Sequence, residues 1–120
     1  MISLQKRRFI ERFIELADFP CITPADSMEL NLLPLRLSLV WHEAHLAVML
    51  TVTKLVGNER LLLPELLATC QPEHTFGIPC RAFVLPGVLG IAANVPVEAG
   101  PETAYALYRW QYQWLRHYCD

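Results

Sequence analysis

The chain has 120 residues and a formal net charge of −2, and hydrophobic residues make up 53% of it. This length suits one domain with a single core, and the scattered lysines and arginines provide no continuous basic surface for nucleic acid. The longest uncharged stretch, residues 82–97, is interrupted by proline and glycine and is too short to span a membrane. We therefore expect one domain over residues 1–120, with part of its apolar surplus left on the surface.

The first predicted element is an amphipathic helix over Ser3–Asp18. Its apolar residues largely keep helical spacing and are Leu4, Phe9, Ile10, Phe13, Ile14 and Ala17. Charged residues take most of the other face, and they also interrupt the apolar run that an export signal would need. The helix is expected to end before Pro20, because proline disfavours helical geometry in the residue that precedes it.

Alternating apolar residues predict three strands in the next segment. One set of alternating apolar residues comprises Met28, Leu30 and Leu32. A second set, shifted by one residue, comprises Leu33, Leu35, Leu37, Leu39 and Trp41. Because a shift of one residue turns every side chain to the opposite face, the change of phase beside Pro34 predicts a bulge or a break between two strands. Alternation resumes after His42-Glu43 at Leu46, Val48, Leu50 and Val52, which predicts a hairpin.

The second half of the chain is expected to contain two helices and two strands. A helix from about Glu59 to Thr69 carries more leucines than one narrow stripe can hold. Cys80–Leu85 and Val88–Val95 are predicted strands joined by a tight turn at Pro86-Gly87. A final helix is expected from Pro101 to about His117. Its segment carries Tyr105, Tyr108, Trp110, Tyr112, Trp114 and Tyr118, too many aromatic rings for one buried stripe.

These elements predict an α+β fold. Their order is helix, three strands, helix, two strands, helix, and we expect an antiparallel sheet flanked by helices.

The histidines and cysteines form no recognisable metal-binding or catalytic motif. The four cysteines, Cys21, Cys70, Cys80 and Cys119, include no Cys-x-x-Cys spacing, which favours free thiols in a reducing cytosol. His42 and His45 flank the predicted hairpin turn, and we expect them to project to different faces. No nucleophile elbow or phosphate loop accompanies any cysteine and histidine. We therefore expect no cofactor, and less than one zinc ion per purified chain.

The segment Gly77–Leu85 is followed by a turn, a strand and an aromatic helix that ends in Trp114–Cys119. This arrangement resembles the small secretion regulators of the SsaM, CesL and SycN type, among the class I chaperones of bacterial type III secretion. Looser similarity covers Phe9–Asp18 and Leu61–Ala68, so the resemblance spans most of the chain.

The resemblance implies a protein without enzymatic activity, located in the bacterial cytoplasm or peripherally at the secretion apparatus on the inner membrane. It implies pairing with a second small chaperone-like subunit, or with a second copy of the chain, and binding to the secretion gatekeeper. Such a complex would help to order the export of translocators before effectors. We expect neither nucleic-acid binding nor a membrane span.

Two sets of residues are candidates for protein contacts. The predicted subunit interface comprises Leu62, Leu66, Phe83 and Leu85, chosen for their apolar segments and for the dimer contacts of the chaperones that the chain resembles. The predicted partner-binding residues are Trp110, Trp114, Phe9 and Phe13. The alternative from another class is a small cytosolic enzyme with a cysteine nucleophile or a metal site, whose activity would be lost on replacing Cys70 or Cys80.

Overall fold

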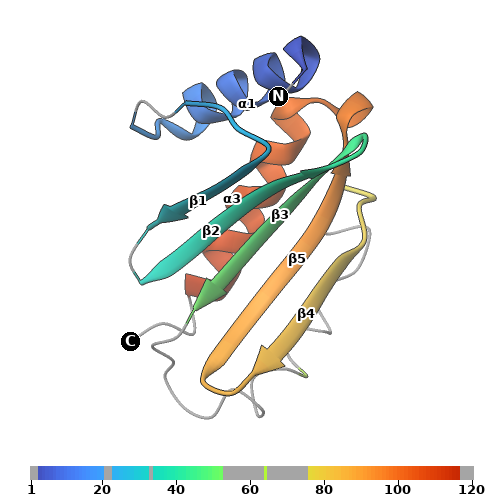
Figure 1. The fold of residues 1–120 in the computed structure, drawn as a ribbon. Coiled ribbons are helices and arrows are strands. Elements are labelled where there is room, and N and C mark those ends of the chain that lie inside the picture. Colours follow the sequence, from blue (N-terminus) through green and yellow to red (C-terminus); the bar gives the residue numbers. More distant parts are fainter. Residues whose placement is uncertain (1–2, 21–22, 33, 53–63, 65–75, 117–120) are drawn as a thin grey trace.

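The computed structural model describes residues 3–20, 23–32, 34–52, 64 and 76–116 (Figure 1). Its elements are α1 (Leu4–Ala17), β1 (Ser27–Asn31), β2 (Leu35–His42), β3 (His45–Val52), β4 (Cys80–Leu85), β5 (Val88–Pro96), the short 3-10 helix η1 (Val97–Ala99) and α3 (Pro101–Arg116). The strands form one antiparallel sheet in the order β1-β2-β3-β5-β4. The predicted α+β fold is confirmed, while the helix predicted at Glu59–Thr69 lies outside the described residues.

Local capping determines where α1 begins and ends. Ser3 is extended, and its hydroxyl oxygen accepts a hydrogen bond from the backbone N–H of Lys6 at 3.2 Å, as an N-cap residue does. At the other end Asp18 adopts a left-handed conformation with φ 56°, and its backbone N–H donates to the carbonyl oxygen of Glu15. The helix therefore ends before Pro20 as predicted, and the left-handed cap at Asp18 is what ends it.

The predicted break between the first two strands is confirmed. β1 ends at Asn31 and β2 starts at Leu35. In the antiparallel pair Met28 lies opposite Leu39 and Leu30 lies opposite Leu37, and all four side chains are buried. The change of phase thus allows both strands to bury their apolar residues on the same face of the sheet.

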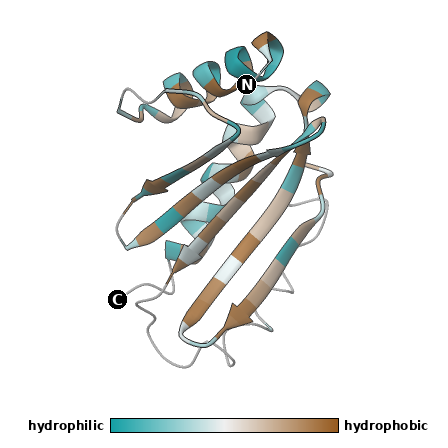
Figure 2. Ribbon diagram, in the orientation of Figure 1, coloured by the Kyte–Doolittle hydropathy of each residue, from teal (hydrophilic) through white to brown (hydrophobic). Residues whose placement is uncertain are grey.

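The core lies between one face of the sheet and the two described helices. β3 and β5 are central, and Figure 2 shows that hydrophobic residues dominate them. Their buried residues are Leu46, Val48, Leu50, Val52, Leu89, Ile91, Ala93 and Val95. They form one cluster with buried residues of α1 and α3. Each buried leucine, isoleucine or valine of this kind stabilises the fold by roughly 1.5–3 kcal/mol.

A polar side chain sits inside this core. Gln111 of α3 is fully buried and donates a hydrogen bond from Nε2 to the carbonyl oxygen of Val48 at 3.4 Å, which links α3 to the central strand. In the parts of the chain that the structure describes, no helix is long and apolar enough to cross a membrane.

Candidate functional site

The face of the sheet opposite α1 and α3 is called the outer face here. Side chains alternate between the two faces of a strand, so the neighbours of the buried residues Leu89, Ile91 and Ala93 point outward. The buried residues of both described helices belong to the core cluster on the other side. The outer face is therefore the side of the sheet that neither α1 nor α3 covers.

Two of the predicted interface residues lie on the outer face. Phe83 pairs with Gly90 and Leu85 pairs with Val88 in the β4–β5 hairpin, so both share the orientation of the outward residues of β5. The Phe83 ring lies directly over Gly90, where a Cβ atom would overlap it. Leu85 is 55% exposed and belongs to an edge strand of the sheet. The other two candidates, Leu62 and Leu66, lie outside the described residues.

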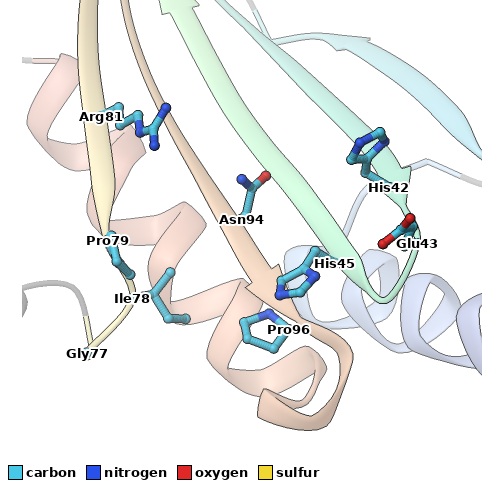
Figure 3. Close-up of a pocket in the computed structure, with 9 residues that line it drawn as sticks. All are labelled: His42, Glu43, His45, Gly77, Ile78, Pro79, Arg81, Asn94 and Pro96. Atoms are coloured by element: carbon cyan, nitrogen blue, oxygen red, sulfur yellow. The ribbon is translucent and has the colours of Figure 1, made fainter.

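A cavity of about 430 Å³ opens on the outer face near the β2–β3 turn (Figure 3). Its lining residues are His42, Glu43, His45, Gly77, Ile78, Pro79, Arg81, Asn94 and Pro96. Figure 3 shows that they come from β2, the β2–β3 turn, β3, β5, β4 and the segment before β4. This surface unites residues from segments far apart in the sequence.

The prediction that His42 and His45 project to different faces is wrong. The two residues lie directly opposite each other in the antiparallel β2–β3 pair, and opposed residues share a face. Only Glu43 and Ala44 separate them, and Glu43 has a positive φ of 55°, which closes a two-residue hairpin loop. The pair completes no metal site, since no group of three or more metal-ligating side chains occurs among residues that the structure describes.

The two tryptophans predicted to bind a partner lie on one flank of α3. Trp110 and Trp114 are four residues apart, so they lie on the same side of the helix. Both are half-buried and pack against the margin of the core. α1 packs on the opposite flank through Phe13, which contacts Tyr105 and Tyr108. The tryptophan flank therefore faces away from α1.

The positions of Phe9 and Phe13 do not suit the partner-binding role that was predicted for them. Phe9 is 4% exposed, and its ring packs edge-on against Trp41 with centroids 5.3 Å apart. Phe13 is fully buried. Both rings lie on the apolar stripe of α1 and attach this helix to the chain's own core, which argues against their direct contact with a partner. The helical spacing of these residues already indicated that stripe.

A tyrosine cluster between α1 and α3 was not singled out from the sequence. Tyr105, Tyr108 and Tyr112 line a shallow cavity of about 300 Å³ together with Ala17, Arg109 and Gln113. Arg109 donates a hydrogen bond to the Tyr105 hydroxyl at 3.0 Å and lies over its ring. The i, i+3, i+7 spacing of the three tyrosines was the available signal.

A family model described as SsaM matches residues 3–118 of the chain. The match includes α1, all five strands, α3 and every candidate contact residue named above. No curated protein gives a significant match.

Proposed function

Because the chain belongs to the SsaM family, which is associated with type III secretion, we propose that it is a regulatory subunit that binds the secretion gatekeeper. In this proposal a second small chaperone-like subunit binds alongside it, and the complex helps to place translocator export before effector export. The chain acts without catalysis, in the bacterial cytoplasm or peripherally at the secretion apparatus.

The outer face is the structural observation that supports contact with a second subunit. Its edge strand β4 presents Phe83 and the exposed Leu85, and neither α1 nor α3 covers this side of the sheet. An edge strand that carries apolar side chains and that neither described helix covers favours pairing with another chain, and proteins that remain monomeric usually protect such edges with charge, proline or a covering segment. We assign the contact with the second small subunit to this surface.

The tryptophan flank of α3 is the proposed contact for the gatekeeper. Trp110 and Trp114 lie side by side there and remain half-buried, so each has apolar surface available to a partner. Tryptophan is among the residues that most often dominate binding energy when a partner covers them. The outer face and this flank lie on different layers of the described structure, so the two proposed contacts share no residue.

Affinity purification of the tagged chain from its native bacterial cytosol, followed by mass spectrometry, tests the proposal. We expect the gatekeeper and one other small subunit to co-purify with it, and light scattering on the purified material distinguishes a heterodimer from a homodimer. A clean preparation without secretion components would contradict the proposed role. Zinc at one ion per chain, or an activity that depends on Cys70 or Cys80, would instead favour the small-enzyme alternative.

A further inference from the structure

The cavity on the outer face is bordered by hydrogen-bond donors from four adjacent strands. His42 of β2, His45 of β3, Asn94 of β5 and Arg81 of β4 all line it (Figure 3). Within the described parts of the chain, none of these four side chains forms a hydrogen bond or an ion pair. The described structure thus holds a permanently charged guanidinium and three further polar groups beside one opening, and it pairs none of them with another described side chain.

This donor group adjoins the apolar part of the outer face. Arg81 lies two residues before Phe83 on β4, so both side chains project from the same side of the strand. Arg81 pairs with Ala92, which is two residues before Asn94 on β5. A partner that packs on Phe83 and Leu85 would therefore bring its neighbouring residues to the cavity.

The cavity suits a carboxylate side chain. Arginine forms short, paired hydrogen bonds with carboxylates, and the amide of Asn94 and the imidazoles can donate further ones. Ile78, Pro79 and Pro96 supply an apolar lining that matches the methylene groups of glutamate. Glu43 also lines the cavity, and its negative charge opposes a doubly charged phosphate more strongly than a singly charged carboxylate.

We propose that this cavity receives a carboxylate side chain from an acidic segment of a partner protein, whose adjacent apolar residues pack on Phe83 and Leu85. The inference rests on the proposed function, because it specifies the chemistry of the subunit that binds the outer face. The charge complementarity with Arg81 identifies the occupant as acidic.

Nuclear magnetic resonance titration of the purified chain tests this inference with defined probes. The probe is the peptide acetyl-Glu-Ser-Val-Ser-Val-amide, and the matched control peptide has Gln in place of Glu. We expect the Glu peptide to shift the side-chain resonances of Arg81, Asn94 and both histidines. The Gln peptide should bind at least about tenfold more weakly, because the carboxylate's charge-assisted hydrogen bonds are lost.

Two variants test whether binding of the Glu peptide depends on the cavity or on the general positive charge of the outer face. Arg81→Gln should weaken binding of the Glu peptide by about tenfold. Arg36→Gln is the control, because Arg36 is exposed on the same face but pairs with Thr51 at the far end of β2 and β3, and it should change the affinity by less than about twofold. Circular dichroism establishes that both variants remain folded.

Three results would overturn the inference. The first is that the Glu peptide does not bind, and the second is that the Gln peptide binds as tightly as the Glu peptide. The third is that inorganic phosphate shifts the same resonances at a concentration equal to or lower than that of the Glu peptide. The last result would identify a site for small anions. None of these outcomes depends on the gatekeeper. The co-purification experiment tests the proposed function separately.

Discussion

At the scale of single residues, burial changes the acid–base behaviour of Tyr108 in α3. It is 7% exposed, and its ring contacts Phe13 and Phe19 at centroid distances of 5.8 and 5.6 Å. Burial raises the pKa of its hydroxyl to about 12, with smaller contributions from Tyr112 and Tyr105, because the apolar surroundings disfavour the phenolate. The native chain therefore holds this proton more tightly than the unfolded chain does.

The alkaline pH dependence of stability follows from this raised pKa. Below the ordinary tyrosine pKa of 10.0, Tyr108 is protonated in both states and its contribution is fully present. As pH rises from there through about 12, the unfolded chain loses the proton first, so the free energy of unfolding falls. We expect Tyr108→Phe to reduce this fall, measured by denaturant unfolding at a series of alkaline pH values. Identical pH profiles for the variant and the wild type would contradict the prediction.

At the scale of elements, an aromatic cluster attaches α1 to α3. Phe13 is fully buried and contacts Phe19, Tyr105 and Tyr108. Arg12 adds ion pairs to Glu15 and to Glu102 of α3, but all three side chains are largely exposed, and exposed pairs contribute little. The position of α1 therefore depends on its buried rings.

Replacing Phe13 by alanine tests this dependence. The variant leaves a cavity between α1 and α3, so the free energy of unfolding should fall by roughly 3–5 kcal/mol. Leu4→Ala is the matched control in the same helix, because Leu4 is 62% exposed and its loss should change stability by no more than about 0.5 kcal/mol. Denaturant unfolding measures both variants. A loss below about 1 kcal/mol for Phe13→Ala would return this residue to the candidates for partner binding.

At the scale of the whole molecule, assembly should depend on the outer face. Phe83→Asp places a carboxylate where a second subunit would bury it unpaired, which costs several kcal/mol, roughly enough to convert a nanomolar contact to a micromolar one. The chain itself should tolerate the change, because Phe83 projects from the outer face and not into the core. Light scattering should then report a smaller oligomeric mass.

Leu4→Asp is the control for this prediction. It places the same charge on an exposed apolar residue of α1, away from the outer face, and should leave the oligomeric mass unchanged. Circular dichroism must find retained structure in both variants. An unchanged mass and intact partner binding for Phe83→Asp would mean that the interface lies elsewhere.

The sequence by itself determined the elements and their order in the described chain. Helical spacing placed α1, alternation placed β1 to β3, and the change of phase at Leu32 and Leu33 separated β1 from β2. The turn signal at Pro86-Gly87 placed β4 and β5. These features depend on residues close together in the chain. Helices and strands each impose a fixed spacing on the residues that share a face, so local spacing is enough to predict them. The resemblance to secretion regulators came from the same segments, and the family match agrees with it.

Only the tertiary structure decided which distant segments meet. The position of β5 between β3 and β4 brings Asn94 and Arg81 beside His45, and no local pattern specifies that strand order. The register of the β2–β3 hairpin turned His42 and His45 to one face, because the two-residue loop makes them opposed partners. Packing of α1 likewise placed Phe9 against Trp41 of β2 and Phe13 against α3, inside the core. Alternation specifies which residues share a face, but non-local pairing and packing decide what each face meets.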